Sequence, residues 1–111
     1  MKNGIYHVTF SSSVGGKGEG LVVVKDGSIN GGDAGYLYVG KINNSRETLS
    51  GVLNIKQWNQ GHVSVFGTIN AFELQISGNT SQGDFFMMSG KVPSQPGLTI
   101  QINGRFISEV A

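Results

Sequence analysis

The stretch from Asp26 to Gly40, DGSINGGDAGYLYVG, is the most suggestive place for chemistry in this sequence. Glycine-rich loops can cradle a phosphate with backbone amides at the start of a helix. Residues 35–41 match the spacing G-x-x-x-x-G-K, but Ile42 follows where a magnesium-binding Ser or Thr is needed. The four residues between these glycines are apolar and strand-forming. We therefore interpret the cluster as a turn-forming element and predict no nucleotide site.

The residues available for catalysis or metal binding are few. The chain has two histidines, seven carboxylates and no cysteine, which excludes a thiolate nucleophile and zinc ligation by sulfur. His7 lies in a strand-like segment and His62 in an apolar loop, and no spacing places either beside a nucleophile. The sequence predicts a protein that is not an enzyme and needs no metal or cofactor.

The glycines and aspartates of the opening stretch are typical of β-structure. Asp26 and Gly27 form an Asp-Gly pair, which predicts a tight hairpin because both residues accept positive φ. Gly31, Gly32 and Asp33 predict a second structural turn. Asp33 could be a ligand-binding acid, but an aspartate in a glycine turn more often accepts hydrogen bonds from nearby backbone amides, and we favour that role.

Charge and hydropathy limit the possible partners and location. A formal net charge of +1, without a run of Lys or Arg, disfavours binding to nucleic acid or to a membrane surface. No apolar run approaches the roughly 20 residues needed to span a bilayer. The start, MKNGIYHVTF, lacks the apolar core of a signal peptide, so we expect a cytoplasmic protein.

Alternation of apolar and polar residues with a period of two dominates the chain and predicts about eight strands. No segment of ten or more residues has a helical period, so the strands should run antiparallel in meander order. Closure removes the edges of such a sheet. We predict an all-β protein, a lipocalin-like, eight-stranded, antiparallel up-and-down barrel, in one domain over 1–111. The strands are expected at residues 4–10, 20–25, 28–30, 34–43, 47–58, 70–78, 83–92 and 98–107.

The connection over residues 59–68 is apolar for a loop. We expect it to form a short turn, or a single helical turn, that folds over one end of the barrel. Trp58 precedes it, and either lines the mouth of the barrel or packs at the strand end.

Face assignment separates two kinds of strand. Several strands have one apolar face, and their side chains are the candidates for barrel lining and for contacts with a small apolar ligand: Leu53, Ile55, Phe72, Leu74, Ile76, Ile100 and Ile102. The segments GLVVVK, GYLYV and DFFMM are apolar on both faces. Their outer faces need a cover, and a second copy of the chain would provide it. Candidates for this homodimer interface are Tyr36, Tyr38, Phe86 and Met88.

An eight-stranded barrel lies at the margin between a filled interior and one with room for a small ligand. Aromatic and branched side chains favour filling, whereas Gly51 and Gly104 are expected to leave gaps on the inner face. A ligand in such an apolar gap would be held mainly by buried area and would bind weakly.

Residues 3–10 (NGIYHVTF) and 18–41 (GEGLVVVKDGSINGGDAGYLYVGK) resemble the start of the GrlR-type negative regulators of type III secretion. The resemblance implies a cytoplasmic, lipocalin-like barrel with an apolar interior that dimerises. It also implies binding to a transcriptional activator, which is thereby silenced.

The loop after the aromatic strand departs from this family, which carries the acidic run EDED there. This chain has Asn43, Asn44, Ser45, Arg46 and Glu47 at that place. A fold can carry over without its partner, because function belongs to sites. Two hypotheses remain open: a regulatory protein-interaction module, and a carrier or sensor of a small apolar ligand.

Overall fold

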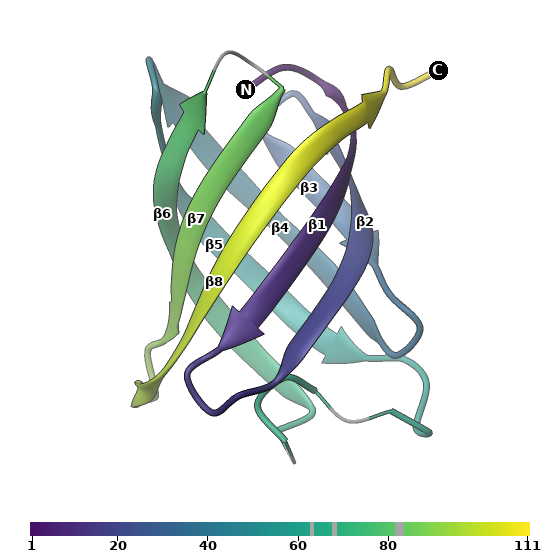
Figure 1. Ribbon diagram of the computed structural model, residues 1–111, viewed down its shortest axis with the longest axis vertical. Coiled ribbons are helices and arrows are strands. Elements are labelled where there is room, and N and C mark those ends of the chain that lie inside the picture. The colour runs from purple at the N-terminus through teal and green to yellow at the C-terminus, as the bar shows by residue number, and fades with distance from the viewer. Residues whose placement is uncertain (63, 68, 82–83) are drawn as a thin grey trace.

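The computed structural model describes residues 1–62, 64–67, 69–81 and 84–111. Its regular elements are β1 (Gly4–Ser12), β2 (Lys17–Lys25), β3 (Ser28–Gly32), β4 (Tyr36–Ser45), β5 (Thr48–Gln57), β6 (Ala71–Ser81), β7 (Phe85–Val92) and β8 (Gln95–Ser108). Each strand pairs antiparallel with its neighbours in the chain, and β1 pairs with β8 to close the barrel (Figure 1). The predicted all-β, eight-stranded, up-and-down barrel is therefore confirmed. No helix of the described residues is long and apolar enough to cross a membrane.

The hairpin between β2 and β3 forms at the predicted Asp-Gly pair. Lys25 pairs with Ser28, and the two residues between them, Asp26 and Gly27, have φ values of 50° and 82°. The backbone N–H of Asp26 donates to the Asn3 side chain (3.0 Å), which ties this turn to the chain start. The left-handed backbone of both turn residues matches the twist of the strands that they join.

The connection between β5 and β6 crosses the end of the barrel at which β1 stops and β2 starts, the lower end in Figure 1. Ser64 and Gly67 form a short bridged turn, and Phe66 between them is buried. The Ser12 hydroxyl donates to the carbonyl oxygen of Val65 (2.7 Å), which fixes the turn against β1. Of the two predicted alternatives, the structure shows the short turn at 64–67; residues 63 and 68 lie outside the described residues.

The core is the inward-facing row of side chains on all eight strands. Of the seven predicted lining residues, Phe72 is partly buried, and the other six are buried: Leu53, Ile55, Leu74, Ile76, Ile100 and Ile102. This row follows from the alternation of side chains along each strand.

The four residues expected at a dimer surface are inside the barrel, which corrects that expectation. All four are buried, with exposed fractions between 1% and 7%: Tyr36, Tyr38, Phe86 and Met88. Both faces of these strands are apolar, so the alternation alone did not say which set points outward. The outward members of the same strands are Leu37, Val39, Phe85 and Met87, each between 43% and 59% exposed.

Candidate functional site

A cavity of about 270 Å³ occupies the half of the barrel nearest the β1–β2, β3–β4 and β5–β6 connections. Its inner wall is apolar and comes from strands all around the barrel: Val8, Val22, Ile29, Leu53, Ile55, Phe72, Leu74, Phe86, Met88, Ile100 and Ile102. Six of the seven predicted lining residues are in this set, and Ile76 is buried outside it. An apolar wall of this kind can hold an apolar molecule.

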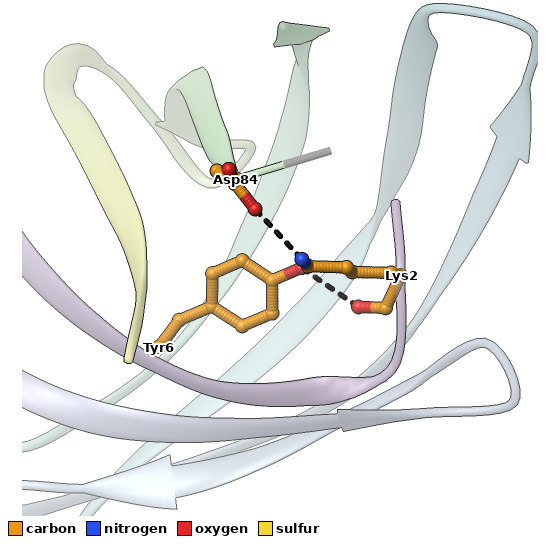
Figure 2. A network of polar contacts seen from close by, with 3 residues as sticks. All are labelled: Lys2, Tyr6 and Asp84. Carbon is orange, nitrogen blue, oxygen red and sulfur yellow. Dashed lines mark hydrogen bonds and ion pairs between the residues drawn. The ribbon is translucent and has the colours of Figure 1, made fainter. Parts of the chain in front are cut away.

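The opposite end of the barrel is closed by packed aromatic rings. Tyr6 is fully buried, with its ring centroid 5.4 Å from that of Phe86 and 5.6 Å from that of Phe106. Figure 2 shows Lys2 between Tyr6 and Asp84. The Lys2 ammonium lies 2.7 Å from the Asp84 carboxylate, and the Lys2 carbonyl oxygen accepts a hydrogen bond from the Tyr6 hydroxyl (2.7 Å). The same ammonium lies 3.8 Å from the centre of the Phe106 ring. Burial, followed by the charge of Asp84, raises the pKa of Tyr6.

Two glycines that were expected to leave gaps in the interior do not. A Cβ atom on Gly104 would lie 2.1 Å from the Phe86 ring, so that ring already fills the space. A Cβ atom on Gly51 would lie 2.3 Å from the carbonyl oxygen of Lys41 in the adjacent strand. The expectation of gaps at these positions is wrong, because cross-strand neighbours occupy them. The cavity instead lies between the Phe86 ring and the mouth.

The mouth of the cavity carries a polar group built on Asp33, which precedes β4. Asp33 Oδ1 accepts hydrogen bonds from the backbone N–H groups of Gly35 and Tyr36 (both 2.8 Å). Asp33 Oδ2 accepts the hydroxyl of Tyr38. The turn-forming role predicted for Asp33 is thus present, and the residue also lines the cavity. Gly31 and Gly32, which were predicted in the same turn, are instead paired residues of β3. The sequence did not reveal the hydrogen bond between Asp33 and Tyr38, because it forms only when the Tyr38 side chain points into the barrel.

Tyr38 is held in its neutral form. Burial is the main cause of its raised pKa, and the hydrogen bond to Asp33 and the charge of Asp33 add to it. The ring contacts Phe10 edge-on, with centroids 6.0 Å apart. The Tyr38 hydroxyl therefore remains a donor to Asp33 in neutral solution.

The start of the β5–β6 connection fixes the Asp33 turn from outside. The Trp58 backbone N–H donates to the Gly35 carbonyl oxygen (2.9 Å), and its indole N–H donates to the Asp33 carbonyl oxygen (3.0 Å). The Asn59 side chain donates to the Ala34 carbonyl oxygen (3.0 Å). Trp58 is 56% exposed and lies beside the mouth without lining it. As the single tryptophan of the chain, it is placed to report changes at this turn.

The outside of the barrel carries a separate set of apolar side chains on β2 and β4, on either side of β3. We call Leu21, Val23, Leu37 and Val39 the outer wall; Leu21, Leu37 and Val39 are 43–50% exposed, and Val23 is partly buried. Leu21 and Leu37 each pair with Gly32 of the strand between them, and Val23 and Val39 each pair with the same residue of β3. Gly32 has no side chain between Leu21 and Leu37, whereas the exposed Asn30 stands between Val23 and Val39.

At the place where the GrlR-type regulators carry an acidic run, this chain has a short turn. Arg46 has a φ of 58° and, with Glu47, forms the two-residue connection between the paired Ser45 and Thr48. The Thr48 hydroxyl donates to the Ser45 carbonyl oxygen (2.8 Å). Asn43 through Glu47 are all exposed and carry one positive and one negative charge. The turn therefore offers no acidic patch.

The two histidines do not form a site together. His7 lies 3.7 Å from the exposed carboxylate of Glu19, and His62 lies at the cavity mouth. Among the residues that the structure describes, no group of three or more His, Asp and Glu side chains is placed to hold a metal ion.

Comparison with known proteins identifies a family and a relative in fold. The family model described as "T3SS negative regulator, GrlR" matches residues 1–110. Among solved structures, the chain is similar to the isotype 1 transferrin binding protein B of serogroup B Neisseria meningitidis, with a TM-score of 0.59 and 12% identity. That match covers 96% of this chain and 26% of the other, so the chain spans about a quarter of that protein, and the likeness concerns the fold alone. No curated protein matches the sequence.

Proposed function

The chain belongs to the GrlR family of T3SS negative regulators, and we propose that it acts as a negative regulator of type III secretion by binding another protein. The family match over residues 1–110 is the observation that carries this proposal. In this account the barrel is a non-catalytic, cytoplasmic interaction module. Its described residues offer three apolar features for such a role: the outer wall, the cavity, and the exposed Phe85 and Met87 of β7.

We assign protein contacts to the outer wall, including contact between two copies of the chain. Three neighbouring side chains there, Leu21, Leu37 and Val39, are close to half exposed. Grouped exposed apolar residues on a soluble protein commonly mark an interaction surface. The Arg46–Glu47 turn is too short and too nearly neutral to replace an acidic partner-binding loop. A regulator with this turn would therefore need another surface for its partner.

Affinity capture from bacteria that carry a type III secretion system tests this assignment, with a secretion reporter measured in parallel. The Leu37→Glu variant places a charge on the outer wall, and we expect it to lose the captured protein and the repression. Gln101→Glu is the matched control, because it adds the same charge on β8 and keeps the acceptor for the Ser89 hydroxyl (3.1 Å). Equal capture and repression by both variants and the unmodified chain would rule out the outer wall.

A second candidate function, a carrier or sensor of a small apolar ligand, is supported by the cavity of about 270 Å³ and its apolar wall. At roughly 30 Å³ of liquid volume per water, that space matches a molecule of about nine or ten non-hydrogen atoms. Extraction of the purified protein followed by mass spectrometry tests occupancy. Repeated recovery of one small apolar compound supports this function, and an extract without any such compound argues against it.

A further inference from the structure

The polar atoms at the cavity mouth make the second candidate function more specific. Asp33 and Tyr38 both line the cavity, and one hydrogen bond joins them. Asp33 Oδ1 is occupied by two backbone N–H groups, from Gly35 and Tyr36. A carboxylate has about four acceptor positions, so Oδ2 retains capacity beyond the Tyr38 hydroxyl.

The Tyr38 hydroxyl has a single hydrogen, and it is directed at Asp33. Its oxygen can still accept a hydrogen bond, but it has no second hydrogen to donate. The pair therefore presents acceptors, and one negative charge, to a molecule in the cavity. Glu19 and Lys17 also belong to the lining of the mouth, but the Glu19 carboxylate is largely exposed and lies 3.7 Å from His7.

We propose that the cavity takes a small amphiphile whose chain fills the apolar wall and whose head group donates hydrogen bonds to Asp33 and Tyr38, as an alcohol or a protonated amine does. This inference rests on the ligand-binding candidate function. A carboxylate head is disfavoured, because it has no hydrogen to donate and meets a like charge at Asp33. The apolar wall sets chain length, and the Asp33–Tyr38 pair sets head-group selectivity. Small-molecule sites commonly combine an apolar lining with a few polar groups in this way.

Lys17 is the group that could reverse this preference, since an ammonium at the rim would attract an anionic head. Its side chain is exposed to solvent, whereas Tyr38 is 7% exposed and Asp33 is partly buried. Charge interactions weaken in solvent and strengthen with burial. The Asp33–Tyr38 pair should therefore outweigh Lys17.

Four probes of matched size separate donor capacity from charge: nonylammonium, 1-nonanol, methyl octyl ether and octanoate, each of about ten non-hydrogen atoms. Binding to the full chain is measured by titration calorimetry at neutral pH, with Trp58 fluorescence as a second readout. We expect nonylammonium and 1-nonanol to bind most tightly, the ether more weakly, and octanoate at least about tenfold more weakly than nonylammonium.

Two variants identify the atoms responsible. Asp33→Asn keeps a side-chain oxygen for the Gly35 and Tyr36 amides, so the turn is retained while the charge is removed. In this variant the preference for nonylammonium over octanoate should shrink to within about threefold. Tyr38→Phe keeps the carboxylate, so the preference for the ammonium should persist. Circular dichroism and denaturant unfolding of each variant check that the barrel is intact.

The outcomes separate this inference from the functions on which it rests. Octanoate binding as tightly as nonylammonium, or a preference unchanged in Asp33→Asn, overturns the head-group assignment and leaves the ligand-binding function standing. No binding of any probe at about millimolar concentration overturns both the assignment and the ligand-binding candidate. The regulatory function depends on the capture experiment and is not affected by either result.

Discussion

The interior of this barrel is packed differently at its two ends. At the end that contains the chain start, Tyr6 and Phe86 are 0–1% exposed and pack with Phe106 over Gly4 and Gly104. At the other end, Phe10 and Tyr38 stand against the wall and leave a cavity of about 270 Å³. The comparison shows that an eight-stranded barrel can be a solid core at one end and an apolar container at the other. Stability should therefore depend on the first end, and binding on the second.

The largest expected difference comes from removing one ring at each end. Phe86→Ala removes a fully buried ring and should lower the free energy of unfolding by about 3–5 kcal/mol. Phe10→Ala removes a partly exposed ring at the cavity end, and about 1–2 kcal/mol is expected. Denaturant unfolding of both variants measures the two losses. Equal losses would contradict the division of roles between the ends.

Replacing a glycine by alanine at each end should show the same difference between the two ends, with a smaller loss of stability. A Cβ on Gly104 would lie 2.1 Å from the buried Phe86 ring, so Gly104→Ala should cost about 1–3 kcal/mol of stability. At the cavity end, a Cβ on Gly18 would lie 2.6 Å from the Phe10 ring, which has free space beside it. Gly18→Ala should cost less than about 1 kcal/mol. Thermal unfolding compares the two variants. A larger loss of stability for Gly18→Ala than for Gly104→Ala would contradict the tighter packing of the closed end.

Alkaline pH should act more strongly at the cavity end. The pKa of Tyr38 is raised in the folded chain above its ordinary value of 10.0 by burial and by Asp33. Above about pH 10 an unfolded tyrosine loses its proton while folded Tyr38 keeps it, so stability is present below that pH and falls as pH rises. The slope approaches about 1.4 kcal/mol per pH unit for one such group.

Tyr6 provides the comparison, because burial and Asp84 raise its pKa too, but its hydroxyl donates to a backbone carbonyl instead of a carboxylate. We expect Tyr38→Phe to flatten the alkaline slope more than Tyr6→Phe does. Urea unfolding at several pH values between about 9 and 11 measures both slopes. A greater flattening by Tyr6→Phe would show that the closed end controls alkaline stability.

The smallest effect is expected at the surface cap of the closed end. Lys2 is 48% exposed and its partner Asp84 is 56% exposed, so their ion pair is well screened. Lys2→Gln should lower stability by less than about 1 kcal/mol, mostly through its contact with the Phe106 ring (3.8 Å). Thermal unfolding at low and high salt measures it. A loss of several kcal/mol would mean that the cap, and not the rings beneath it, holds this end closed.

The barrel itself was largely readable from the sequence. Alternation with a period of two located the strands, and the Asp26–Gly27 pair located a hairpin whose φ values are positive as predicted. Strands with one apolar face, such as that of Leu74 and Ile76, were also oriented correctly. In these cases local pattern and global fold require the same residue types.

The site was less predictable, because it depends on which side of an evenly apolar strand points inward. In GYLYV and DFFMM both faces are apolar, so Tyr38 and Phe86 could not be assigned from alternation. The Tyr38 side chain points inward, so its hydroxyl reaches Asp33. The Phe86 side chain also points inward, and its ring fills the space over Gly104. Each contact joins residues of different elements or distant chain positions, which a local pattern does not encode.

Methyl NMR of the full chain during titration with 1-nonanol tests the division of the barrel most directly. We expect shift changes for the cavity-lining methyl groups of Leu53, Met88 and Ile102. No change is expected for the buried methyl groups outside the cavity, those of Val24, Ile42 and Leu49. Shift changes confined to the outer wall, at Leu37 and Val39, or the absence of any change at saturating nonanol, would contradict this division.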